Sequence, residues 1–329
     1  ILGSIHSVTY FTEEAWMQDY IQFNTDKRKK SKNPFEKEFF KLLNNSVYGK
    51  TMENVREYMN LKLVTSGQID VWRRNASKPT YASTHIFNEN LVAVLFHKCS
   101  VTLDKPIFTG VAVLDLSKLL MYNFWYNNLK KRYDDKIELL YTDTDSFIFH
   151  VITPDWYEDM RQDKKNYDFS GYPAEFKTLS TRLADGTIVP GETLRDTSNM
   201  LVIGKMKDEM AGSFITKFIG LRSKVYCIES CDINGKKYKP TKKAKGIPRK
   251  NVETDLTPAS YSAVLHSGKT TSEHTFRKMQ SKNHNLLVID QTKIGISAND
   301  NKRYVSPQNN IKTLPWGHKD SPVISYLLK

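Results

Sequence analysis

Two aspartates separated by one residue are the side chains whose types and spacing best suit catalysis in this chain of 329 residues. Asp143 and Asp145 lie in residues 141–146, with the sequence YTDTDS. Residues two apart in an extended chain point to the same face, so both carboxylates can face one point. Such carboxylates repel each other unless a cation intervenes, and hard oxygen ligands suit Mg²⁺. A turn that uses Asp and Thr only for local hydrogen bonds is the alternative interpretation.

The segments around these aspartates predict a β-hairpin. Residues 137–141 and 147–151 are rich in apolar and aromatic side chains, and a polar turn joins them. This pattern is typical of two strands that pack against a core. We therefore expect the acidic turn to be held by buried strands.

A second candidate site lies on a predicted helix over residues 34–48. Asn33 is a good N-cap, Pro34 suits the first helical position, and Glu36 completes a capping box. Gly49 is expected to end the helix and to let another backbone or a nucleic acid strand approach closely.

One side of this helix is predicted to present Lys41, Asn45 and Tyr48 in a row. A lysine neutralises a triphosphate, an amide fixes a polar edge, and a flat ring packs on a base or sugar. The opposite, buried stripe is predicted to consist of Phe39, Leu43 and Val47. An ordinary amphipathic helix with a half-exposed tyrosine is the alternative interpretation.

The net charge of +13 is concentrated in two short blocks. Residues 27–50 carry a net +6 and residues 236–250 a net +8, so the rest of the chain sums to −1. Concentrated lysines and arginines suit a polyanion because they displace counterions from phosphates. A solvated face or a localisation signal is the alternative to a nucleic-acid surface.

Composition narrows the class of protein. No window of 18 apolar residues exists, so we expect no membrane span. Three cysteines are too few for a disulfide framework and indicate reduced thiols in an intracellular protein. Aromatic residues at 12% and charged residues at 26% exclude a disordered chain. The start without Met or a signal pattern suggests an internal or C-terminal piece of a longer protein.

The remaining pattern predicts alternating helices and strands. Besides the helix above, helices are expected at 14–32 and 111–132. The expected strands are 61–64, 85–87, 91–96, 201–207 and 214–228. Residues 152–200 are expected to be turn-rich, and the tail from residue 256 to mix short helices with irregular segments.

Several of these segments together resemble one known family. Residues 41–49, KLLNNSVYG, resemble motif B of family B DNA polymerases, K-x3-N-S-x-Y-G, and residues 141–146 resemble their motif C, Y-x-D-T-D-S. Residues 221–226, LRSKVY, resemble the K-x-Y motif that follows, and residues 204–209, GKMKDE, resemble the strand between them. The sequence on both sides of motif B resembles the protein-primed branch found in Polinton/Maverick elements, related viruses and linear plasmids. The likeness is to the C-terminal part of the polymerase domain.

The resemblance implies an α+β fold, with a right-hand polymerase palm (an antiparallel sheet with helices), partial fingers and a thumb. Its boundaries would be residues 1–58 for fingers helices and motif B, and 59–108 for a strand-rich insertion linked to strand displacement. Residues 109–229 would form the palm with motif C and K-x-Y, and residues 230–329 a basic, thumb-like region.

The resemblance also implies roles for individual residues. Asp143 and Asp145 would be catalytic and would bind Mg²⁺ in a two-metal site. Nucleotide contacts would come from Lys41, Asn45, Tyr48, Arg28 and Lys32. DNA contacts would come from Gly49, Lys224, Tyr226, Lys242, Lys243, Lys245 and Arg249. The implied partners are primer–template DNA, dNTPs and a terminal protein as primer, in an intracellular setting such as a nucleus, virus factory or organelle.

The chain departs from the family in one way that bears on activity. Two-metal phosphoryl transfer needs a third carboxylate, which the family supplies from motif A, D-x2-S-L-Y-P. Neither that motif nor an exonuclease domain occurs in this sequence. We therefore expect either a DNA polymerase fragment, inactive alone, or a non-catalytic nucleic-acid-binding remnant. An unrelated Mg²⁺ phosphotransferase would make the order of the motifs a coincidence.

Overall fold

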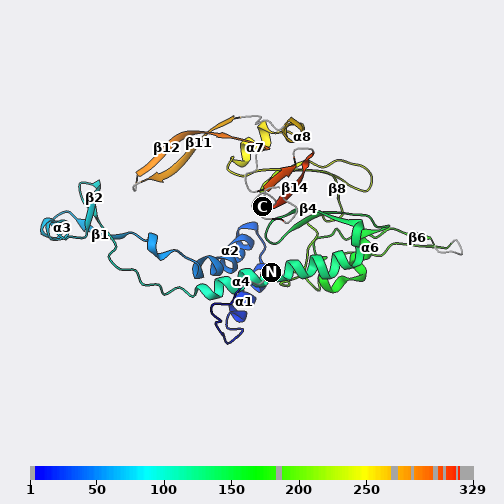
Figure 1. Cartoon of the computed structure of the whole chain (residues 1–329), viewed down its shortest axis with the longest axis horizontal. Coiled ribbons are helices and arrows are strands. Elements are labelled where there is room, and N and C mark those ends of the chain that lie inside the picture. Colours follow the sequence, from blue (N-terminus) through cyan, green and yellow to red (C-terminus); the bar gives the residue numbers. More distant parts are fainter. Residues whose placement is uncertain are drawn as a thin grey trace. The chain divides into compact units, whose positions relative to one another are not determined.

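The computed structural model describes residues 4–182, 187–267, 273–282, 285–298, 303–306, 309–315 and 318. Its elements are traced in chain order in Figure 1. The chain divides into two compact units, and each is described by itself. Unit 1 comprises Ile1–Lys62, Asp70–Ser83 and Val94–Ser117. Unit 2 comprises Leu63–Ile69, Thr84–Ala93 and Lys118–Lys329. Helices and antiparallel sheets occur together, which confirms the predicted α+β class.

The first half of the chain is mainly helical. Its elements are α1 (Gln18–Lys30), α2 (Pro34–Thr51), η1 (Val55–Glu57), β1 (Asn60–Thr65), α3 (Ile69–Ala76), β2 (Tyr81–Asn88), β3 (Leu91–Phe96) and α4 (Ile107–Tyr122). The three strands form a sheet in the order β1-β3-β2. Helix α3 was not predicted, and α1 is shorter than the expected 14–32.

Helix α2 begins as its sequence predicts but ends later. The Asn33 side chain accepts a hydrogen bond from the Glu36 N–H at 2.8 Å, as expected of an N-cap. Gly49 was expected to end the helix, which is wrong, because the helix continues to Thr51. A Cβ at Gly49 would meet nothing within 4 Å, so the described chain leaves the approach to this residue open.

Helix α2 packs against α1 through polar as well as apolar groups. The Tyr20 hydroxyl donates to the Leu43 carbonyl at 3.5 Å, and the Asn44 amide donates to the Thr25 hydroxyl at 3.3 Å. Of the predicted buried stripe, Leu43 and Val47 are half-buried. Phe39 is 46% exposed, which corrects its prediction; it packs instead on the neighbouring rings of α2.

The second half of the chain contains the predicted hairpin and a larger sheet. Its elements are η2 (Asn123–Lys130), α5 (Lys131–Tyr133), η3 (Asp134–Lys136), β4 (Ile137–Thr142), β5 (Phe147–Val151), α6 (Trp156–Gln162), η4 (Lys164–Asn166), β6 (Thr181–Arg182), β7 (Ile188–Val189), β8 (Phe214–Arg222), β9 (Val225–Cys231), β10 (Thr241–Ala244), α7 (Arg249–Asp255), α8 (Pro258–Ser267), β11 (Glu273–Lys282), β12 (Asn285–Ile294), β13 (Arg303–Ser306) and β14 (Asn309–Pro315).

Strands β4 and β5 form an antiparallel hairpin that is anchored in a core, as predicted. Trp125 and Leu129 of the π-helical segment η2 are buried together with Tyr133 and Ile137. Phe147 and its neighbours on β5 pack against this cluster. The helical run before the hairpin therefore fixes the strands that carry the acidic turn.

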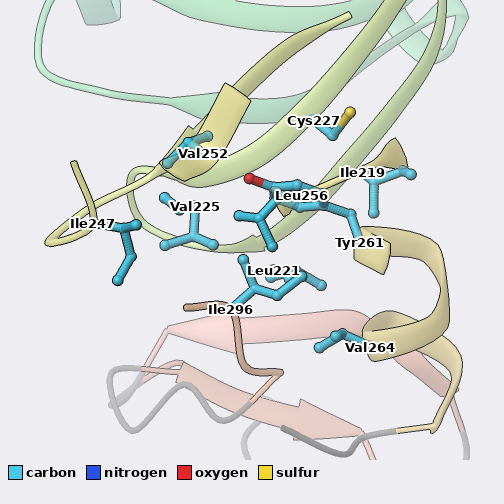
Figure 2. Close-up of a cluster of buried hydrophobic side chains, with 11 residues drawn as sticks. Ile219, Leu221, Val225, Cys227, Ile247, Val252, Leu256, Tyr261, Val264 and Ile296 are labelled. Carbon is cyan, nitrogen blue, oxygen red and sulfur yellow. The ribbon is translucent and has the colours of Figure 1, made fainter. Parts of the chain in front are cut away.

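Strands β8, β9 and β10 form a sheet in the order β10-β9-β8. The expected strand 214–228 is thus two strands joined by a tight turn. Beneath the sheet, Tyr261 and Val264 of α8 lie among side chains of β8 and β9, as Figure 2 shows. The Tyr261 hydroxyl donates to the Lys243 carbonyl at 3.0 Å, which ties the edge strand β10 to this core.

One further prediction for unit 2 is wrong, and another is only partly correct. Residues 201–207 form turns instead of a strand, because Leu201 has a φ of +57° and Gly204 a φ of +84°. The Asp168 carboxylate, which is buried, accepts from the Leu201 N–H at 3.1 Å and holds this conformation. The tail contains the short helix α8, as expected, but also the ten-residue strands β11 and β12, which were not expected.

The expectation of no membrane span stays a prediction beside one long apolar helical run, Ile107–Lys136. Among the described residues this run is 30 residues long and apolar enough to cross a membrane, by length and composition alone. Its first part is exposed on several sides. The exposed apolar side chains of α4 are Ile107, Phe108, Val111, Val113, Leu116, Leu119, Leu120 and Tyr122.

Candidate functional site

The turn between β4 and β5 holds both candidate aspartates in a defined backbone conformation. The Asp143 N–H donates to the Ser146 carbonyl at 3.1 Å, and the Asp145 N–H donates to the Asp143 carbonyl at 2.7 Å. Thr144 between them adopts a left-handed φ of +58°. Asp143 is half-buried and Asp145 is exposed, so this tight turn leaves the second carboxylate open to solvent.

Tyr141, the last buried side chain before the turn, connects the hairpin to the K-x-Y segment. Its hydroxyl accepts a hydrogen bond from the Lys224 N–H at 2.9 Å. Its ring lies 5.1 Å from the Tyr226 ring and 6.0 Å from the Phe218 ring, measured between centroids. Two segments that are 83 residues apart in sequence therefore meet at one side chain.

Lys224 lies in the turn between β8 and β9 and reaches the acidic turn. Its backbone has a left-handed φ of +60°, and its Nζ lies 2.8 Å from Asp143 Oδ2. The hydrogen bond and charge of Asp143 raise the pKa of the Lys224 ammonium. The carboxylate that is proposed to bind metal is thus paired with a lysine.

The second basic block begins beside the same turn. In the β9–β10 pairing Lys243 lies opposite Tyr226, and the Lys245 N–H donates to the Lys224 carbonyl at 3.1 Å. The side chains of Lys243 and Lys245 are exposed, and so is that of Arg249 at the start of α7. Unit 2 therefore brings the acidic turn, the K-x-Y turn and part of the basic block together.

Two other lysines of this block have structural contacts. The Lys242 ammonium donates to the carbonyls of Glu253 at 2.9 Å and Leu256 at 2.6 Å, at the C-terminal end of α7. Lys239 pairs with the Glu253 carboxylate at 2.6 Å. Cations at a helix C-terminus stabilise its unpaired carbonyls. Sequence reasoning assigned Lys242 to DNA because the pairing of β10 with β9 is not visible in the local sequence.

The candidate nucleotide-binding stripe belongs to unit 1. Lys41, Asn45 and Tyr48 are exposed on α2, as predicted, and Lys41 lies 3.7 Å from Glu38 of the same helix. The other two candidates are further along the basic block. Arg28 is half-buried near the end of α1, and Lys32 is exposed between α1 and α2. These residues belong to unit 1 and the hairpin belongs to unit 2.

The side chains of the acidic turn meet some of the requirements of a divalent cation. The two aspartate carboxylates supply hard oxygen donors, and the ammonium at Asp143 shows that this position favours a positive charge. Throughout the residues that the structure describes, no group of three His, Cys, Asp or Glu side chains is placed to hold a metal ion. The pair therefore fits a cation as a partial ligand set.

Sequence reasoning missed a charged cluster that follows α2. The Glu53 carboxylate pairs with Lys50 at 2.7 Å and with Lys105 at 3.6 Å, and Tyr58 also contributes a hydrogen bond. The hydrogen bonds from Lys50 and Tyr58 lower the pKa of Glu53 to about 2, and the one from Lys50 has the larger effect. Lys98 donates to the Val55 carbonyl nearby, at 2.7 Å. The cluster joins the end of α2 to the segment that enters α4. Lys50 and Glu53 are three residues apart, but Lys98 and Lys105 are too far along the sequence for their contacts to be assigned from spacing.

Comparisons with known proteins give no further identification. No protein-family model, no curated protein and no solved structure matches this chain.

Proposed function

We propose that this chain is part of a template-directed DNA polymerase of the family B type, with the catalytic hairpin of the palm at residues 141–146. The basic C-terminal region would serve as a thumb and α2 as part of the fingers. The proposal rests on the order and content of the four motifs, together with the structure of unit 2.

The meeting of the acidic turn with the K-x-Y turn is the observation that carries this proposal. A polymerase needs metal-binding carboxylates next to groups that hold the end of the primer strand. Here the 2.8 Å contact between Lys224 Nζ and Asp143 Oδ2 joins these two groups. A turn used only for its own hydrogen bonds would not require this long-range partner.

In this proposal, different residues of the chain would have different roles. Asp143 and Asp145 would hold divalent cations, which supply Lewis-acid stabilisation of the transferring phosphoryl group when bound. Lys224 and Tyr226 would hold the primer strand, and exposed Lys243 and Lys245 would contact phosphates. On α2, the stripe of Lys41, Asn45 and Tyr48 would bind the incoming dNTP. A third carboxylate would have to come from outside these residues.

The second candidate is a non-catalytic nucleic-acid-binding remnant of such a polymerase. The exposed cations Lys243 and Lys245 beside the K-x-Y turn favour it, because they form a basic surface that can bind phosphates without any chemistry. Both candidates predict DNA binding, and only the first predicts nucleotide incorporation.

Primer extension separates the two candidates. The chain is expected to bind primer–template DNA and not to extend it alone. Joined to the protein segment encoded directly upstream, it is expected to add the nucleotide complementary to the template in the presence of Mg²⁺. Failure of the joined protein to extend a bound primer would contradict the polymerase and favour the remnant; failure to bind DNA at all would contradict both.

A further inference from the structure

Three contacts from two segments, the acidic turn with its preceding strand and the residue Lys245, fix the position of Lys224. Its N–H donates to the Tyr141 hydroxyl at 2.9 Å, and its carbonyl accepts from the Lys245 N–H at 3.1 Å. Its Nζ lies 2.8 Å from Asp143 Oδ2. A left-handed φ is uncommon for a residue with a side chain, so these contacts compensate for an unfavourable backbone conformation.

The two charged groups of the Lys224–Asp143 ion pair can separate. The Lys224 side chain is 49% exposed and that of Asp143 is 28% exposed, so water can solvate both groups when they separate. Exposed ion pairs contribute little net free energy. The backbone contacts to Tyr141 and Lys245 do not involve the ammonium, so they can hold the turn while the ammonium moves.

A divalent cation and the Lys224 ammonium compete for the same carboxylate oxygen. A cation bound at Asp143 Oδ2 would repel the ammonium, because two positive charges would then share one carboxylate. A phosphate of a bound strand is the natural new partner for the ammonium. Because coupling between two binding events is reciprocal, the strand would in turn favour the cation.

We propose that Lys224 is an exchangeable counter-charge of Asp143, and that Tyr141 is the positioning residue that holds it there. Binding of a divalent cation at Asp143 then releases Lys224 to a phosphate of the nucleic acid, so cation and strand bind cooperatively. This inference rests on the proposed function for the identity of the strand; the competition between cation and lysine does not depend on it.

The first test measures Mn²⁺ binding to the chain without DNA, by electron paramagnetic resonance. Binding at the turn is taken as the part lost in Asp143→Asn. Lys224→Met is expected to tighten this binding about two- to fivefold, the range of a surface ion pair. Lys224→Arg should restore the wild-type value, and Tyr141→Phe should tighten binding by less than Lys224→Met does. A merely structural role of Lys224 would leave the Mn²⁺ affinity unchanged.

Lys245→Met is the matched control, because Lys245 is a neighbouring exposed cation whose side chain forms no ion pair with Asp143 in the part of the chain that the structure describes. It is expected to leave the Mn²⁺ affinity within about 1.5-fold of wild type, since its charge is screened by water and salt. Equal effects of Lys224→Met and Lys245→Met would show a general field effect and overturn the proposal.

The second test measures primer–template binding by fluorescence anisotropy, in EDTA and in Ca²⁺ at constant ionic strength. In the wild type Ca²⁺ is expected to tighten binding about two- to fivefold. Asp143→Asn should bind tightly already in EDTA and lose the response, and Lys224→Met should bind weakly and also lose it. A response that persists in Lys224→Met would overturn the coupling.

The outcomes separate this inference from the proposed function. If primer extension succeeds while Lys224→Met leaves the Mn²⁺ affinity unchanged, the polymerase proposal is supported and the proposal that Lys224 is an exchangeable counter-charge is wrong. If extension fails while Lys224→Met tightens Mn²⁺ binding and Lys245→Met does not, the proposed exchange between Lys224 and the cation is supported and the polymerase proposal is contradicted.

Discussion

The acidic turn in unit 2 and the α2 stripe in unit 1 were both singled out by residue type and spacing, but they are held in different ways. Around the turn, Tyr141, Lys224 and Lys245 make hydrogen bonds that join three segments. On the stripe, Lys41 and Tyr48 are exposed on the surface of one helix. Groups that must act on reacting atoms gain from fixed positions, whereas groups that bind a mobile ligand can be ordered by it.

The largest effect is expected at the acidic turn. In a protein completed by the upstream segment, Asp145→Asn should reduce nucleotide incorporation by about 1000-fold or more, roughly 4 kcal/mol of barrier, because the variant lacks a carboxylate that we propose to bind the catalytic cation. Single-turnover incorporation measures the effect, and DNA affinity should stay near wild type. Incorporation within about tenfold of wild type would contradict the assignment of the hairpin to the catalytic site.

A smaller effect is expected on the stripe. Lys41→Ala should raise the KM for dNTP about tenfold with a smaller change in kcat, because a charged phosphate contact acts partly in the ground state. Steady-state kinetics over a range of dNTP concentrations would show this. Lys37→Ala, one turn earlier on α2, is the matched control and should change KM less than about twofold. Equal effects of both variants would mean that only the general charge of α2 matters.

The basic block allows a sharper comparison of exposed and engaged lysines. Replacing Lys243 and Lys245 together by Met should make the slope of log K against log salt less steep by about 2, since each phosphate contact contributes about 0.9. Lys242→Met should leave the slope unchanged, because its ammonium is bound to carbonyls of the chain. DNA binding at several salt concentrations tests both. A Lys242 effect as large as that of the pair would contradict the assignment.

The same lysine should matter for stability. Lys242→Met removes two hydrogen bonds at the end of α7 and should lower the free energy of unfolding by about 1–2 kcal/mol. Lys243→Met, on the exposed side of β10, should change it by less than about 0.5 kcal/mol. Urea denaturation compares the two variants. If Lys242→Met were as stable as Lys243→Met, the hydrogen bonds from Lys242 to the end of α7 would contribute nothing to the free energy of unfolding.

The smallest effect concerns the Glu53 cluster, through pH. The pKa of Glu53 is lowered to about 2, mainly by its hydrogen bond with Lys50. A depressed carboxyl pKa stabilises the fold above the ordinary value, and this contribution is lost as pH falls towards 2. The difference in Tm between wild type and Glu53→Gln should therefore shrink between pH 6 and pH 2.5. Glu13→Gln, on the exposed N-terminal segment, should show no such trend.

Local sequence was sufficient for some of these features and not for others. The Asn33 cap and the bounds of the hairpin follow from neighbouring residues; the sequence predicted the cap correctly and the hairpin bounds to within one residue. The contact between Lys224 and Asp143 depends on how strands far apart in sequence pair, which no local pattern contains. Strand β11 was missed because its sequence, EHTFRKMQSK, is largely polar and a two-stranded arm buries only one of its faces.

Helix α4 has a consequence for work with the isolated protein. Apolar side chains such as Leu116, at 64% exposure, and Tyr122, at 60%, face water on a helix with few charges. Exposed apolar side chains of this kind favour association between molecules as concentration rises. The purified chain is therefore expected to be polydisperse at the concentrations used for crystallisation, and mild detergent or an added protein segment that covers α4 should restore a uniform preparation.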